Sequence, residues 1–150
     1  MGLKDRLNED LKAAMKASDK ERVLVLRTLL ADIKNEGIRQ QKRDEMSDDG
    51  VVQVLMKAVK TRRDSIEQFE KGNRPDLVAR ERAQIAIIEQ YLPAQLSEEE
   101  IRAVVAQCKE EAAQSGKVEV GTVMKLAMAK LKGKADGKVV QQVVTAMLKP

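Results

Sequence analysis

Apolar residues recur at three- and four-residue intervals through most of this chain, which is the spacing of one buried face of an α-helix. The first such stripe consists of Leu3, Leu7, Leu11 and Met15, and it predicts a helix over about residues 2–17. Further stripes predict helices over about residues 19–42, 48–71 and 75–92. Residues 42–50 are polar and predict an exposed loop.

Two runs have the spacing of a capping box, in which a serine and a glutamate three residues later close the start of a helix. They are Ser-Asp-Lys-Glu at residues 18–21 and Ser-Glu-Glu-Glu at residues 97–100. We therefore predict that each serine caps the helix that follows it. The pattern does not explain why Gly37 and Arg62 stand where apolar residues would continue the second and third stripes.

Pro93 divides the chain, because proline cannot continue a helix and biases the residue before it toward an extended backbone. Beyond it, helical spacing predicts three more helices, over about residues 97–115, 120–131 and 136–148. The middle one is expected to bury Val120, Met124, Met128 and Leu131. The whole pattern predicts an all-α protein of two small helical domains, a four-helix N-terminal part (1–92) and a three-helix C-terminal part (93–150).

Aromatic residues are almost absent: Phe69 and Tyr91 are the only two, and there is no tryptophan. Proteins that bind single-stranded RNA stack its bases on aromatic rings, so two such residues all but exclude a stacking platform here. Cys108 is the only cysteine and lies on an apolar helix face, which favours burial over catalysis. A chain without an intrachain disulfide, a signal peptide or a membrane-spanning run is expected to be cytoplasmic.

The sequence offers little to catalysis. It contains no histidine, the commonest general base and metal ligand, and one cysteine cannot build a thiolate zinc site. It has neither a Walker motif nor a Gly-x-Gly-x-x-Gly motif. We therefore predict no catalytic residue, no metal ligand and no cofactor, and we do not expect an enzyme that works on its own.

Positive charge gathers near the C-terminus. Residues 117–150 hold seven lysines against two acids, whereas the whole chain holds 28 basic and 24 acidic residues. A local basic loop can approach phosphate oxygens, although a solvated lysine loop without a ligand would have the same composition. Asp136 is expected to cap the last helix and occupy its N–H groups, which leaves phosphate to the lysine side chains. The candidate RNA-binding residues are Lys125, Lys130, Lys132, Gly133, Lys134 and Lys138.

Several segments resemble the YqeY family in sequence and in order. They are Lys-Thr-Arg-Arg-Asp-Ser-Ile-Glu-Gln-Phe at 60–69, Asn-Arg-Pro-Asp-Leu at 73–77, Tyr-Leu-Pro-Ala-Gln-Leu-Ser-Glu-Glu-Glu at 91–100, Val-Met at 123–124 and Lys-Gly-Lys-Ala-Asp-Gly at 132–137. The resemblance implies an all-helical protein whose C-terminal part is similar to the tail domain of the GatB subunit of tRNA-dependent Asp/Glu amidotransferase. In that enzyme the tail contacts tRNA, and Gly133, Lys134 and Ala135 match its glycine-lysine loop.

The resemblance also implies a link to carbon–nitrogen ligase activity with glutamine as amido donor. That chemistry belongs to parts of the larger enzyme to which nothing in this chain corresponds. We therefore expect a tRNA-binding accessory protein of translation. Two alternatives stay open: a protein-interaction module that docks through its N-terminal helical domain, and a non-catalytic component linked to the ligase. The sequence does not indicate the oligomeric state.

Overall fold

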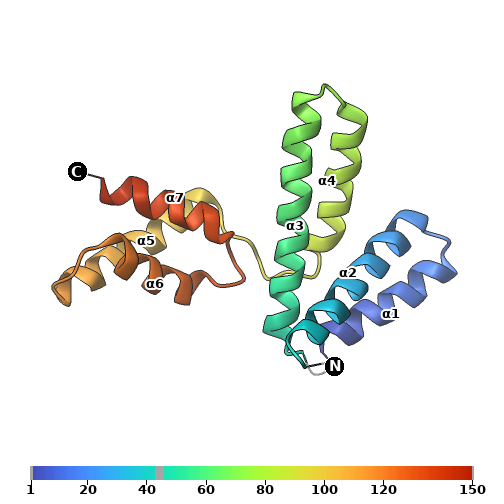
Figure 1. The fold of residues 1–150 in the computed structure, drawn as a ribbon, viewed down its shortest axis with the longest axis horizontal. Helices are drawn as coiled ribbons and strands as arrows, with labels where there is room; N and C mark the ends of the chain where they lie inside the picture. Colours follow the sequence, from blue (N-terminus) through green and yellow to red (C-terminus); the bar gives the residue numbers. More distant parts are fainter. Residues whose placement is uncertain (1, 43–45, 150) are drawn as a thin grey trace. The chain divides into compact units, whose positions relative to one another are not determined.

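A computed structural model describes residues 2–42 and 46–149, and within them every regular element is an α-helix (Figure 1). In chain order the helices are α1 (Leu3–Lys16), α2 (Lys20–Arg39), α3 (Asp48–Lys71), α4 (Pro75–Glu89), α5 (Glu98–Gln114), α6 (Val120–Leu131) and α7 (Gly137–Leu148). The predicted all-α fold is confirmed. Of the expected loop at residues 42–50, residues 43–45 lie outside the described residues, and residues 48–50 already belong to α3.

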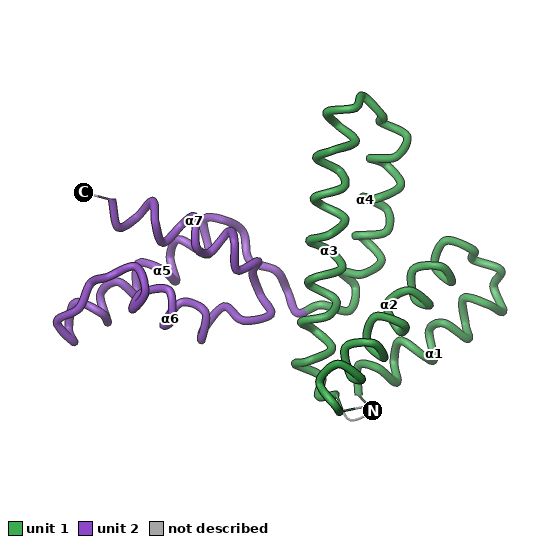
Figure 2. Tube along the Cα trace, viewed as in Figure 1, with its two compact units in different colours: residues 1–92 green, residues 93–150 purple. Residues whose placement is uncertain are grey.

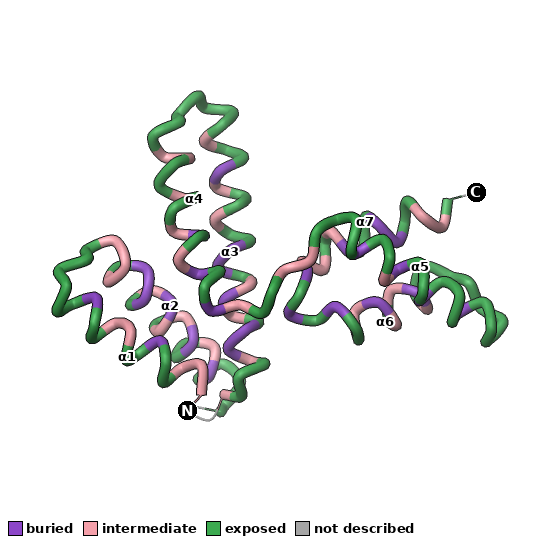
Figure 3. Tube along the Cα trace, turned by 180° about the vertical axis from the view of Figure 1, so that it is seen from behind, coloured by how far each residue is buried: buried purple, intermediate pink, exposed green. Residues whose placement is uncertain are grey.

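The chain divides into two compact units, residues 1–92 and residues 93–150 (Figure 2). In the first unit α1 lies beside α2, α3 lies beside α4, and α2 also contacts both α3 and α4. Its core is aliphatic apart from Tyr91 and includes Leu7, Leu26, Leu29, Leu55 and Ile88. The far end of the α3–α4 pair, around residues 71–77, is largely exposed (Figure 3).

The second unit packs α5, α6 and α7 against one another around its own core. Cys108 is fully buried there, and burial raises the pKa of its thiol, as expected of a cysteine that serves as a small apolar residue. One part of the predicted core is wrong. The buried residues of α6 are Val123, Ala127 and Leu131, whereas Val120 is 43% exposed. The row of α6 that faces the core contains the small residue Ala127, which allows close packing there. Val120 is exposed because it is the first residue of the helix.

The helix ends confirm one capping box and correct the other. Ser97 accepts from the N–H of Glu100 at 3.1 Å, and Glu100 accepts in turn from the N–H of Ser97 at 3.2 Å. Ser18 does not cap α2. It adopts a φ of +55° in the turn that ends α1, and Asp19 accepts instead from the N–H of Arg22 at 3.2 Å. The connection is so short that Ser18 is used to close one helix, and the next residue caps the following one.

The structure shows where the two residues that interrupt the apolar stripes lie. Gly37 is buried within α2, which continues through it to Arg39. Half-buried Arg62 on α3 donates from Nε to the side-chain oxygen of Gln84 on α4 at 3.0 Å, and Gln84 donates to Glu21 on α2 at the same distance. Arg62 therefore joins three helices through one polar chain.

We expect each unit to fold by itself, and limited proteolysis tests this. The exposed backbone between the units lies at Pro93 and Ala94, whereas Gln95 and Leu96 are half-buried. A protease of broad specificity is expected to cut near residues 92–94 and leave a stable fragment of residues 1–92, identified by mass spectrometry and circular dichroism. A fragment that unfolds once it is released would contradict this prediction.

Candidate nucleic-acid interface

The predicted basic loop is a tight turn between α6 and α7. Lys132 follows the last residue of α6, and Gly133 adopts a φ of +81°, a left-handed conformation that glycine tolerates without strain. The N–H of Lys134 then donates back to the carbonyl oxygen of Leu131 at 2.9 Å. The turn is therefore closed by its own backbone, and Gly133 is buried within it.

Asp136 ends this turn and caps α7, as the sequence predicted. Its carboxylate accepts from the N–H of Lys138 at 2.7 Å. A phosphate group at this helix end would compete with a carboxylate that is already in place. The side chains of the lysines, rather than the end of the helix, are the groups that can reach an anion.

The segment before α5 holds the basic turn in position, which sequence reasoning missed. The N–H of Leu96 donates to the carbonyl oxygen of Lys134 at 2.9 Å. The side-chain nitrogen of Gln95 donates to the carbonyl oxygens of Gly133, at 2.8 Å, and Pro93, at 2.9 Å. The bond from Gln95 to Gly133 joins residues 38 positions apart along the chain. No pattern in the sequence indicates these contacts, beyond the presence of Gln95 in the segment that resembles the family.

The predicted contact lysines differ in how their charge is used. Lys130 pairs with Glu111 of α5, with 2.6 Å between the ammonium nitrogen and the carboxylate oxygen. The hydrogen bond to Glu111 raises the pKa of Lys130. The other four lysines are exposed and have no ion-pair partner within residues 2–42 and 46–149; they are Lys125, Lys132, Lys134 and Lys138. Their four charges are available to a ligand, whereas the charge of Lys130 is already compensated.

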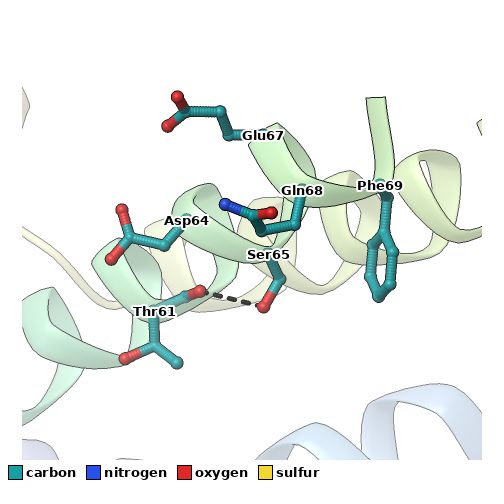
Figure 4. Close-up of a pocket in the computed structure, with 6 residues that line it drawn as sticks. All are labelled: Thr61, Asp64, Ser65, Glu67, Gln68 and Phe69. Atoms are coloured by element: carbon teal, nitrogen blue, oxygen red, sulfur yellow. Dashed lines mark hydrogen bonds between the residues drawn. The ribbon is translucent and has the colours of Figure 1, made fainter. Parts of the chain in front are cut away.

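An open pocket on the side of α3 offers a different kind of surface (Figure 4). Its lining includes Asp64, Ser65 and the half-buried ring of Phe69. The hydroxyl of Ser65 donates to the carbonyl oxygen of Thr61 at 3.1 Å, so it is bonded to its own helix rather than to a base. In the part of the chain that the structure describes, no three acidic or cysteine side chains come together as a metal site.

Replacing Gln95 by alanine tests whether the basic turn depends on this contact. The change removes two hydrogen bonds and leaves the carbonyl oxygen of Gly133 without its side-chain donor. We expect a loss of about 1–2 kcal/mol in the free energy of unfolding. Amide hydrogen exchange at Lys134 and Ala135 should become faster, while exchange in α5 stays slow. Unchanged exchange in the turn would show that Gln95 does not hold it.

Comparison with known proteins finds similarity over nearly the whole chain. A family model described as Yqey-like protein matches residues 4–148. Three similar relatives carry the name Altered inheritance of mitochondria protein 41, mitochondrial. The one from Lachancea thermotolerans is 44% identical over 73% of this chain and 59% of its own length. The one from Kluyveromyces lactis is 39% identical over 67% and 55%, and that from Pyrenophora tritici-repentis is 32% identical over 94% and 80%.

The match spans little more than half the length of the first two relatives. All three are named as mitochondrial proteins, which contradicts the cytoplasmic localisation expected from the sequence. The physical reason is that a lone cysteine excludes an intrachain disulfide but does not distinguish between compartments in which disulfides are rare. Among the described residues, no helix combines the length and the apolar character needed to cross a membrane.

Proposed function

The chain belongs to the YqeY family, and from this premise we propose that it is a tRNA-binding accessory protein that holds RNA through its C-terminal unit. One observation carries the proposal. Lys125, Lys132, Lys134 and Lys138 are exposed and make no ion pair within the described residues, while the neighbouring Lys130 is neutralised by Glu111. Unpaired lysines around a closed turn are suited to phosphate oxygens.

The chemistry of these residues limits what such a contact can recognise. Lysine presents a mobile point charge, which attracts phosphate but does not distinguish one base from another. Both aromatic residues belong to the other unit, where Tyr91 is buried and Phe69 is half-buried. The proposed binding therefore depends on backbone charge and on the shape of a folded RNA, and tRNAs of different sequence should bind alike.

Salt dependence of tRNA binding tests the proposal directly. If three or four lysines each meet a phosphate, the logarithm of the affinity should fall with the logarithm of salt concentration at a slope of about −2 to −4. Filter binding or fluorescence anisotropy with purified tRNA at several salt concentrations measures this slope. Undetectable binding at low salt would refute the proposal, as would a marked preference among tRNAs that share the same overall shape.

A further inference from the structure

We propose that a second copy of this chain docks on the outer face of α2 and forms a weak, parallel, two-fold dimer. The buried residues of α2 define its core side; they are Val25, Leu26, Leu29, Ile33 and Gly37. The opposite side carries Leu24, which is 46% exposed, and Ile38, which is 56% exposed. These are two of the three large hydrophobic residues that the described part of the first unit leaves exposed.

The middle of this outer face carries no charge. Positions 24, 28, 31, 35 and 38 lie within about 40° of one line along the helix. They hold leucine, threonine, alanine, asparagine and isoleucine, although 35% of the chain is charged. The hydroxyl of Thr28 already donates to the carbonyl oxygen of Leu24 at 2.9 Å. Alternating steps of four and three residues are those of a coiled-coil seam, in which one asparagine can fix the register of a dimer.

The two edges of this seam have opposite charge. Arg27 and Lys34 follow one edge, whereas Glu21 and Asp32 follow the other. Arg27, Lys34 and Asp32 have no ion-pair partner in the described part of the chain. Arg39, further along the acidic edge, is already paired with Glu36.

The charges on the two edges favour a second copy of the chain as the partner, with its α2 helix parallel to the first. When two identical helices pack in parallel about a two-fold axis, the left edge of one lies against the right edge of the other. Arg27 then faces Asp32 of the second copy, five residues further on, which is the usual pairing across a parallel seam. In the same register Lys34 faces Arg39 of the second copy, whose charge is already compensated by Glu36, so the attraction rests on the Arg27–Asp32 pairs. An antiparallel pair would instead place like edges together and oppose lysine and arginine with their own kind. A second copy in parallel orientation is therefore the occupant that the edges favour.

The expected dimer is weak. From Leu24 to Ile38 the seam is only about 21 Å long, and one of its central residues is alanine. Such a short seam buries less than stable interfaces do, so dimers should appear only as protein concentration rises. Dimer formation does not depend on RNA binding, because the seam and the lysine turn belong to different units.

Sedimentation velocity of the full chain over a range of concentrations tests the dimer. Leu24→Glu combined with Ile38→Glu should raise the dimer dissociation constant by about 100-fold or more, since apolar contacts are replaced by like charges. Both residues are exposed, and circular dichroism would show that the helices persist. The matched control is Val118→Glu with Val120→Glu, at 44% and 43% exposure in the other unit, which should dimerise as the unaltered chain does. A chain that stays monomeric at all concentrations overturns the proposal, as does equal loss in the control.

Charge exchange tests the direction. Arg27→Glu alone and Asp32→Arg alone should each weaken the dimer, because each places two like charges across the seam. The double variant should restore it, because the pair is rebuilt with its signs reversed. If the double variant dimerises no better than the single ones, the parallel arrangement is wrong.

Discussion

A chain in which Lys132 and Lys134 are both replaced by alanine is expected to bind tRNA about 10- to 30-fold more weakly at physiological salt. Both lysines are exposed and unpaired within the described residues, so the change removes two charges that no ion pair in that part of the chain uses. The loss should be alike for all tRNAs, and the salt slope should become shallower by about two. Fluorescence anisotropy at several salt concentrations measures both quantities.

The matched control is Lys12→Ala with Lys16→Ala, which removes the same net charge from exposed positions of α1. Affinity in this control should change little, because these lysines lie in the other unit. A second comparison uses Lys130→Ala. Because Glu111 already compensates the charge of Lys130, replacing Lys130 should lower the affinity for tRNA less than replacing either Lys132 or Lys134. An equal loss of affinity in all three variants would mean that net charge, and not the basic turn, governs binding.

The positions of the helices follow closely from the sequence, because apolar spacing, capping residues and proline act locally. The limits predicted for α3 and α6 are those observed, and Asp136 and Ser97 cap helices as expected. Local patterns fail where two signals compete within a few residues. Ser18 had the spacing of a helix cap, but it adopts a left-handed backbone conformation in the turn that ends the preceding helix.

The character of the candidate interface was harder to predict, because it depends on contacts between distant residues. The run of lysines was visible, yet nothing local indicated that Lys130 would meet Glu111, 19 residues earlier, and lose its availability. The bond from Gln95 to the carbonyl oxygen of Gly133 likewise joins elements that come together only when the unit folds. Charge content can therefore be read from the sequence, whereas the fraction of it that is free for a ligand requires tertiary structure.

The only tyrosine of the chain offers a probe of the first unit alone. Tyr91 is 3% exposed, donates from its hydroxyl to the carboxylate of Asp10 at 2.5 Å and accepts from Arg22 at 2.8 Å. The guanidinium of Arg6 lies over its ring, 4.8 Å from the centroid. Burial, and then the hydrogen bond to Asp10, raise the pKa of Tyr91 from 10.0 to about 12, although Arg22 acts in the opposite direction.

This raised pKa predicts a loss of stability at alkaline pH. Below pH 10 the phenol of Tyr91 is protonated in both the folded and the unfolded chain, so its contribution is fully present. Between about pH 10 and 12 the unfolded chain loses this proton first, which favours unfolding. The free energy of unfolding of the first unit should therefore fall by about 2–3 kcal/mol over this interval. Urea denaturation followed by circular dichroism measures the fall, and tyrosinate absorbance reports the pKa of the folded chain.

Tyr91→Phe separates this effect from the titration of lysines over the same range. The variant should be less stable by about 1–2 kcal/mol at neutral pH, because Asp10 and Arg22 lose their shared partner. Its stability should nevertheless fall less between pH 10 and 12 than that of the unaltered chain, since both keep the same lysines. The two curves should thus converge as the pH rises. Parallel curves, or a phenol that titrates near pH 10 in the folded chain, would show that the hydroxyl of Tyr91 is not held between α1 and α2 in solution.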